Sequence, residues 1–254
     1  MIWKFIDSGL NTGLYNMDFD LMLAKTLKTD EAILRLYGWK PLCISLGANQ
    51  PEDSINIAKV INDKIDFVKR PTGGRAILHA EELTYSVIYP TNKNFSLSDL
   101  YKQVNLALKK GLALFDERLK EVSLEHNEPH FPSFYEEEKS AVCFAVSSRN
   151  EINYKGKKLV GSAQRNLGNV ILQHGSILCG DYHKKIVDYL ALNKNYLDDI
   201  RIEMNNTTTD LNEILNYKTK IEKLISAIKK GFEEHFGFSF YHSKKEFDLA
   251  LSNG

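Results

Sequence analysis

The chain has 254 residues, and its 33 Lys and Arg side chains are balanced by 33 Asp and Glu. A chain of this length can bury a sizeable core, so one α/β domain with at most a small appendage fits better than two equal domains. Because the net charge is zero, no overall field attracts nucleic acid or a membrane surface, and neither is an expected partner.

The opening residues lack the pattern of a secretory signal. No run approaches the ~18 apolar residues of a membrane-spanning helix. We therefore expect a cytoplasmic protein. The three cysteines, Cys43, Cys143 and Cys179, are widely spaced and include no CxxC pair, which argues against a disulfide framework or a zinc site. Each is expected to be a free thiol, and a free thiol is by default a small buried hydrophobe.

The first half of the chain alternates between helical and extended patterns. Apolar residues at helical spacing predict a helix over 16–28. Residues 32–39 and 41–47 are typical of short strands, and 51–64 predicts a helix that begins at Pro51. Residues 65–70 then predict a strand that runs directly into a glycine pair.

In the second half, Ser96 and Asp99 have the spacing of a capping box at the start of a long core-facing helix. The segment 151–165 predicts a hairpin that turns at Lys155 and Gly156. Further elements are expected in order: a strand over 169–178, a linker at 205–210, helical structure over 211–236, and a last short strand over 237–243.

The stretch "RPTGGR" places Gly73 and Gly74 between Arg70 and Arg75. Glycines adopt positive φ and let a ligand reach the main chain, although most such pairs are ordinary turns. The flanking arginines suggest an anionic or carbonyl-bearing partner, yet exposed arginines are usually solvated. The spacing matches neither a P-loop nor a dinucleotide-binding turn. His79, shortly after this stretch, is as consistent with a core histidine as with a site residue.

A second stretch, "KKLVGSAQR", places Lys158 on the returning strand of the predicted hairpin among apolar residues. A lysine in such surroundings is costly to bury and often marks a functional site, but it can also extend its ammonium group to water. Both interpretations remain open from the residues alone.

The combination of stretches is more specific than any one of them. The chain resembles the lipoate and biotin protein ligase superfamily over residues 1 to about 190, through the ordered segments "NMDFD", "LRLYGWKPLCISLGANQ", "RPTGGRAILHAEELTYSV", "CFAVSSRNEINYKGKKLVGSAQR" and "NVILQHGSIL". Within it, the chain is most similar to the cysteine-dependent octanoyltransferases. This resemblance implies an α/β (α+β) fold with mixed sheets and flanking helices, an acyl tunnel beneath the glycine loop, a catalytic domain over 1–190, and a C-terminal helical appendage over 191–254.

The resemblance also implies the chemistry. Cys143 in "AVCFAV" matches the nucleophile that forms an acyl thioester, and Lys158 matches the lysine that lowers the pKa of that thiol. The donor would be octanoyl-acyl carrier protein, and the acceptor a lipoyl domain such as the glycine cleavage H protein. No cofactor, metal, nucleic acid or membrane is implied. The substrate-binding residues would be Arg70, Gly73, Gly74, His79, Gly161 and Ser162.

Two departures matter. After the glycine pair, lipoate ligases continue with a third glycine and "HDxGN", whereas this chain continues with Arg75 and "HAEELTYS". This difference argues against an ATP-dependent ligase. The octanoyltransferases often continue "CFDxPSWYEL", whereas this chain has "CFAVSSRNEI", which leaves the substrate preference open. An ATP-dependent lipoate or octanoate ligase and a non-catalytic carrier-binding homologue stay as alternatives.

Overall fold

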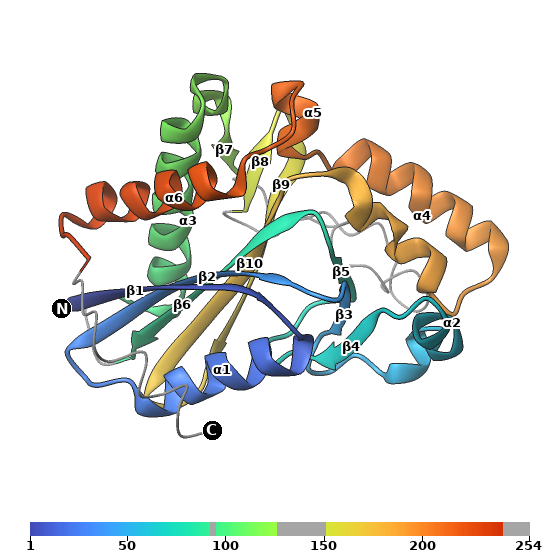
Figure 1. The fold of residues 1–254 in the computed structure, drawn as a ribbon, viewed down its shortest axis with the longest axis horizontal. Helices are drawn as coiled ribbons and strands as arrows, with labels where there is room; N and C mark the ends of the chain where they lie inside the picture. Colours follow the sequence, from blue (N-terminus) through green and yellow to red (C-terminus); the bar gives the residue numbers. More distant parts are fainter. Residues whose placement is uncertain (92–94, 126–150, 241–254) are drawn as a thin grey trace.

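The computed structural model describes residues 1–91, 95–125 and 151–240. Within them the chain forms two β-sheets and a set of flanking helices (Figure 1). The larger sheet has seven strands in the order β1-β2-β6-β10-β9-β8-β7, and the smaller has three in the order β4-β3-β5. In each sheet one pair is parallel, β1 with β2 and β3 with β4, and the other pairs are antiparallel. The predicted mixed α/β architecture is confirmed.

The strands have the following bounds: β1 Ile2–Asn11, β2 Glu31–Trp39, β3 Cys43–Leu46, β4 Asp66–Lys69, β5 Ile77–His79, β6 Glu82–Pro90, β7 Ser123–Leu124, β8 Ile152–Tyr154, β9 Lys157–Asn166 and β10 Val170–Leu178. The helices are α1 Gly13–Thr26, α2 Ile57–Asn62, α3 Leu97–Phe115, α4 Lys194–Thr207, α5 Leu211–Leu215 and α6 Ile221–Phe236. Short 3₁₀ segments are η1 Glu52–Ser54, η2 Glu117–Glu121 and η5 Asp181–Tyr189.

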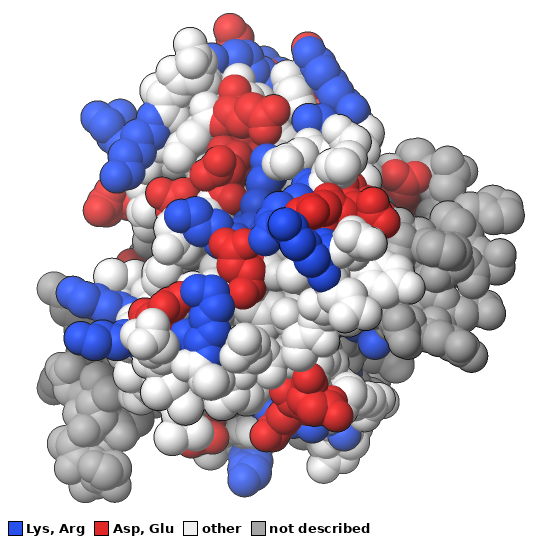
Figure 2. All heavy atoms as spheres, turned by 90° about the vertical axis from the view of Figure 1, so that its right-hand side faces the viewer, with Lys and Arg blue, Asp and Glu red and all other residues white. Residues whose placement is uncertain are grey.

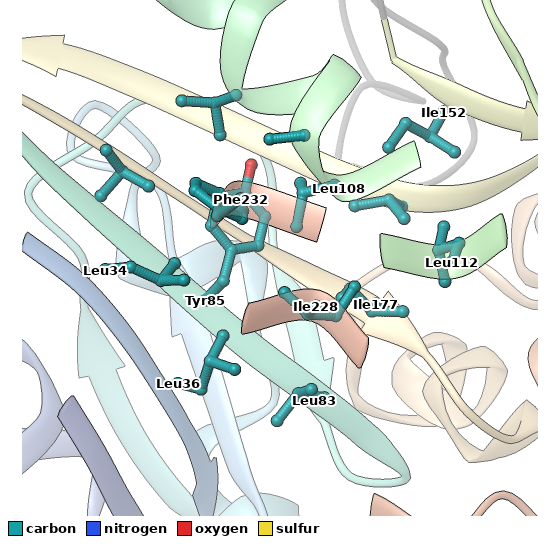
Figure 3. Close-up of a cluster of buried hydrophobic side chains, with 14 of the residues drawn as sticks. Leu34, Leu36, Leu83, Tyr85, Leu108, Leu112, Ile152, Ile177, Ile228 and Phe232 are labelled. Atoms are coloured by element: carbon teal, nitrogen blue, oxygen red, sulfur yellow. The ribbon is translucent and has the colours of Figure 1, made fainter. Parts of the chain in front are cut away.

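The larger sheet is covered on both faces, which explains why every residue of β2 and β6 is buried. Leu34 of β2 packs in the cluster formed with α3 and α6, whereas its neighbour Ile33 packs in the cluster formed with α1. Because successive side chains of a strand point to opposite faces, α3 and α6 lie on one side of the sheet and α1 on the other. Figure 3 shows the first of these clusters, with Tyr85 and Leu108 among its labelled residues.

Helix α3 begins with the predicted capping box, in which Ser96 and Asp99 each bond the other's backbone N–H. Helix α6 crosses it at a pair of glycines, Gly111 and Gly231, where a β-carbon on either residue would collide with the other helix. The C-terminal helices therefore pack directly on the elements that precede them (Figure 1). The domain division at residue 190 stays a prediction.

Four expectations need correction. The helix predicted over 51–64 is divided: Glu52–Ser54 forms a 3₁₀ turn, and α2 begins only at Ile57, where the side chain of Asn56 caps it. The predicted linker 205–210 lies partly in α4, and its Thr208 is fully buried. The helical stretch 211–236 is broken where Asn216 adopts a left-handed conformation. The last short strand was predicted over 237–243. Of this range, residues 238–240 lie within the described part of the chain and do not join a sheet.

None of the described helices is both long enough and apolar enough to span a membrane. Positive and negative side chains are interleaved on the face seen in Figure 2. Among the ion pairs of the protein, Lys59 of α2 contacts Asp63 just after that helix, and Arg201 of α4 contacts Asp188 of η5.

Candidate active site

The glycine loop, residues 70–75, connects β4 to β5. Gly74 has a φ of 96°, a conformation that side chains other than glycine rarely adopt. A β-carbon on Gly47, at the end of β3, would overlap the Gly74 carbonyl, so the two backbones are in close contact. Gly73 is exposed, and a β-carbon there would meet nothing. One glycine of the predicted pair is thus required by the backbone, and the other leaves open space.

The buried side chain of Arg70 stabilises this loop through hydrogen bonds. Its guanidinium group donates to the carbonyl oxygens of Ser45 at 2.9 Å, Gly73 at 3.0 Å and Arg75 at 2.7 Å. The side chain is buried, with 3% of its surface exposed. Since several backbone acceptors surround a charged donor here, the loop conformation depends on Arg70.

A buried polar chain supports the loop from the larger sheet. Nε2 of His174 in β10 lies 2.6 Å from the Thr72 hydroxyl, and its Nδ1 lies 4.0 Å from the Asp20 carboxylate. Arg35 donates to Asp20 at 2.8 Å. Burial lowers the pKa of His174 despite Asp20. Burial acts to raise the pKa of Asp20, but the neighbouring His174 ring and the Arg35 charge together hold it below its ordinary value.

His79 joins the two sheets. Its Nε2 lies 2.8 Å from the Ser45 hydroxyl, its Nδ1 lies 2.9 Å from Glu82, and its ring stacks on Trp39 with centroids 4.0 Å apart. The Glu82 carboxylate also accepts from Ser176 at 2.7 Å. Both ring nitrogens of His79 are therefore engaged, which gives this residue a clear structural role beside any role toward a substrate.

Between these groups lies a pocket with about 400 Å³ of empty space, its open mouth included. Four predicted substrate-binding residues line it: Arg70, His79, Gly161 and Ser162. The rest of its lining consists of Met17, Tyr37, Trp39, Ser45, Ile77, Thr84, Ala163, His174, Gly175 and Ser176. Many of the polar side chains are hydrogen-bonded to one another, so the wall can accept an apolar group without leaving them unpaired.

Lys158 lies in a separate buried cluster next to this wall. Its ammonium group is 2.9 Å from the Glu151 carboxylate, and the two side chains are only 1% and 2% exposed. Glu151 also accepts from the backbone N–H of Ser162, at 3.5 Å, and the Ser162 hydroxyl accepts from Tyr85 at 2.7 Å. The lysine is thus buried and paired rather than extended to water, and Ser162 connects its cluster to the pocket.

Not all of the predicted site residues meet at the pocket. Among the described residues, Gly73, Gly74 and Lys158 lie outside its lining, although the glycines belong to the loop that Arg70 holds. Cys143 lies outside the described residues. The other two thiols, Cys43 and Cys179, are buried, and burial raises the pKa of each, as expected for structural cysteines.

Glu151 and His174 are among the residues of these clusters that sequence reasoning missed. Glu151 begins the predicted hairpin, and an acid facing an apolar strand was a signal for a partner of Lys158. His174 interrupts the apolar run "NVILQHGSIL", and a histidine there was a signal for a buried polar contact. No three His, Cys, Asp or Glu side chains gather as a metal site within residues 1–91, 95–125 and 151–240.

A family model and similar sequences identify the class of protein. The family model of the lipoyl protein ligase A/B catalytic domain matches residues 12–233, and the chain belongs to this family. Among curated proteins, it is 32% identical to octanoyltransferase LipM of Bacillus subtilis over 91% of this chain and 85% of that protein. It is 31% identical to octanoyltransferase LipM of Staphylococcus aureus, over 91% of this chain and 86% of that protein.

Solved structures show the same fold at lower sequence identity. A bipartite lipoate protein ligase from Thermoplasma acidophilum, described with its E2 lipoyl domain, superposes with a TM-score of 0.74 at 17% identity, covering 99% of this chain and 91% of that one. A lipoate-protein ligase A bound with ATP gives a TM-score of 0.74 at 16% identity, covering 99% of this chain and 94% of that one.

Proposed function

We propose that this protein is an octanoyltransferase, which takes an octanoyl group from octanoyl-acyl carrier protein and transfers it to a lysine of a lipoyl-accepting domain. The observation that carries the proposal is the similarity to proteins named octanoyltransferase LipM along nine tenths of the chain. The motif order and the pocket beside the glycine loop are consistent with it. The expected acceptor is a lipoyl domain such as the glycine cleavage H protein, and the expected location is the cytoplasm.

The lining of the pocket suits an acyl chain. Each methylene removed from water contributes roughly 0.8 kcal/mol, so an eight-carbon chain gains substantially from a wall whose polar groups are already paired. Arg70, His79, Gly161 and Ser162 would contact the acyl group or hold the wall that does. Gly73 and Gly74 would offer backbone N–H groups to the thioester carbonyl as negative charge develops on its oxygen.

The chemistry proceeds in two steps. The Cys143 thiolate attacks the donor thioester, the carbonyl bond to the carrier's sulfur breaks, and the carrier leaves as a thiol after taking up a proton. The neutral acceptor amine then attacks the octanoyl enzyme, an amide forms, and the Cys143 thiol is regenerated. The first step exchanges the donor thioester for an enzyme thioester of similar free energy, so no nucleotide is needed. The second step is favourable because an amide forms.

Lys158 would assist both steps. A free thiol with a pKa of about 8.5 is only slightly ionised at neutral pH, and a nearby ammonium group favours the thiolate. In the second step a deprotonated Lys158 is a candidate to accept the proton of the attacking amine. Glu151 extends this proposal, because its carboxylate contacts the Lys158 ammonium and so fixes its position.

Mass spectrometry of the intact protein tests this proposal. After incubation with octanoyl-acyl carrier protein without ATP, we expect one octanoyl addition, and we expect hydroxylamine to remove it. Cys143→Ser should not form this hydroxylamine-sensitive adduct. Cys179→Ala, the matched control at a buried cysteine, should keep it. Absence of an adduct on the wild-type protein, or retention of the labile adduct in Cys143→Ser, would rule out the proposed mechanism.

An ATP-dependent ligase is the second candidate, because the superposed solved structures include lipoate protein ligases. At their low sequence identity these structures show the fold alone. A ligase would modify an acceptor domain from free octanoate only when Mg-ATP is present, and Cys143→Ala would remain active. The octanoyltransferase is expected to show the opposite pattern in both respects. A non-catalytic homologue would bind octanoyl-acyl carrier protein and form neither product.

A further inference from the structure

Three exposed cationic side chains surround the glycine loop. Lys69 is the last residue of β4, Arg75 directly follows the glycine pair, and Arg165 lies in β9. Arg165 is placed by a hydrogen bond of 2.5 Å from its guanidinium group to the Pro71 carbonyl. We call Lys69, Arg75 and Arg165 the loop cations.

Two of the loop cations have side chains with no charge partner among the residues that the structure describes. Within the described parts of the chain, neither Lys69 nor Arg75 forms an ion pair or a side-chain hydrogen bond. Some other surface cations are paired: Lys155 lies 3.5 Å from Glu121 and Lys157 lies 3.8 Å from Glu213. Within residues 1–91, 95–125 and 151–240, the charges of Lys69 and Arg75 are therefore not neutralised by an ion pair.

The loop cations are also close to the pocket. Arg70, which lines it, donates to the backbone carbonyl of Arg75 at 2.7 Å and directly follows Lys69 in the chain. Arg165 lies two residues after the lining residue Ala163. An acceptor domain that brings its target lysine to the pocket beside this loop must bring its own surface toward these charges.

We propose that the loop cations form the docking surface for the acceptor domain, by binding carboxylates beside its target lysine. This inference rests on the proposed function. We choose the acceptor over the donor because the two present their reacting groups on arms of different length. A lysine carries its amine on a four-carbon stem, so the acceptor backbone must approach the loop closely, whereas the long phosphopantetheine arm keeps a donor carrier protein farther away.

Exposed charges of this kind act mainly on encounter rate and partner choice. The loop cations are therefore expected to control acceptor binding and its dependence on salt, with little effect on the acylation of the enzyme. The same surface should discriminate against acceptor domains that present cations beside the target lysine, because like charges repel across an interface.

The test measures binding and each half-reaction separately. The probe is the unmodified form of the glycine cleavage H protein, titrated by fluorescence anisotropy against the full chain at low ionic strength. We expect Lys69→Glu and Arg75→Glu each to weaken binding by about fivefold or more. Lys223→Glu, an exposed charge reversal on α6, is the matched control and should bind like the wild type. Acyl-enzyme formation should be the same in all four proteins.

The decisive experiment reverses one charge on each partner. An H protein in which one carboxylate beside the target lysine is replaced by lysine should bind Arg75→Glu better than it binds the wild-type enzyme. The docking surface is refuted if Arg75→Glu and Lys223→Glu weaken acceptor binding equally. It is also refuted if no replacement of a carboxylate beside the target lysine restores binding to Arg75→Glu. A defect confined to acylation by octanoyl-acyl carrier protein also overturns it. Binding does not require acylation, so a wild-type enzyme that forms no octanoyl adduct refutes the proposed function, while the titration still decides the docking surface.

Discussion

The Glu151 carboxylate lies 2.9 Å from the Lys158 ammonium group, and both side chains are almost completely buried. Removal of one partner from a buried ion pair leaves an uncompensated charge, which typically costs about 3–5 kcal/mol. We expect Lys158→Met to lower the free energy of unfolding by an amount in this range, measured by urea denaturation. The double variant Lys158→Met with Glu151→Gln should recover much of this loss. Strictly additive effects of the two substitutions would contradict the coupling.

The same pair makes a prediction about catalysis. Glu151→Gln keeps the size of the side chain but removes its charge, so Lys158 loses the partner that positions its ammonium group. We expect the turnover number to fall by about tenfold or more while the KM for octanoyl-acyl carrier protein changes little, as for an interaction that acts at the transition state. Glu151→Asp should restore part of the rate. An effect on KM alone would indicate a role in substrate binding instead.

The contact between Gly47 and the glycine loop can be tested with alanine substitutions. A β-carbon at Gly47 would overlap the Gly74 carbonyl, so Gly47→Ala should displace the loop and reduce both activity and melting temperature. Gly73→Ala is the matched control for stability, because a β-carbon there meets nothing. Its melting temperature should stay within about 2 °C of the wild type. Equal melting temperatures for both variants would show that the loop tolerates the added group.

The crossing of α3 and α6 predicts an inverted effect of alanine. Gly→Ala within an exposed helix normally stabilises it by about 1 kcal/mol. At Gly231, however, the new β-carbon would collide with the backbone of Gly111. We therefore expect Gly231→Ala to destabilise the protein by about 2 kcal/mol or more, as in an overpacked core. Ser226→Ala, on the exposed side of α6, should be close to neutral. A stabilised Gly231→Ala variant would contradict the close packing of these helices.

His183 predicts how stability depends on pH. Burial lowers the pKa of this histidine to about 4, with its ring nitrogens 3.1 Å from the Gly180 carbonyl and the Thr208 hydroxyl. The unfolded chain, with a pKa near 6.5, binds more protons than the folded chain between pH 6.5 and 4. Stability contributed by the neutral ring is thus present above this window and is lost as the pH falls through it, by up to about 3 kcal/mol.

Urea denaturation at pH 7 and pH 4.5 measures this loss. His183→Gln, which cannot be protonated, should show a smaller difference between the two pH values than the wild type. His235→Gln serves as a control, because that ring, in α6, is only partly buried and contacts Gln103 rather than the groups around His183. Identical pH dependence in the wild type and His183→Gln would refute this assignment.

The elements that were predictable from the sequence are those with strong local signals. The apolar run of β10, the capping box at Ser96 and the glycine turn after Lys155 each specify a local conformation almost without help from the rest of the chain. Helix α4 lacked such a signal. Its polar "NNT" end is typical of a loop, and only its burial of Ile200 and Met204 against η5 and the smaller sheet makes it helical.

The site shows a similar limit. The residues of the glycine loop and Lys158 were identifiable because they belong to recognisable stretches. The residues that complete their surroundings, among them Trp39, Glu151 and His174, come from distant strands whose register no local pattern specifies. A buried polar residue in the sequence indicates that a partner exists, but the topology of the sheets decides which partner it is.

Hydrogen bonds among Ser45, His79, Glu82 and Ser176 connect the two sheets. Ser45 and His79 belong to the smaller sheet, whereas Glu82 and Ser176 belong to the larger one. The atoms that shape the pocket therefore also fasten the two sheets together. Substitutions here that alter acyl specificity would also remove hydrogen bonds between the two sheets. Such variants should therefore have a lower melting temperature. Met17 and Ile77, which line the same space through apolar contacts, allow the pocket to be reshaped with less disturbance of those hydrogen bonds.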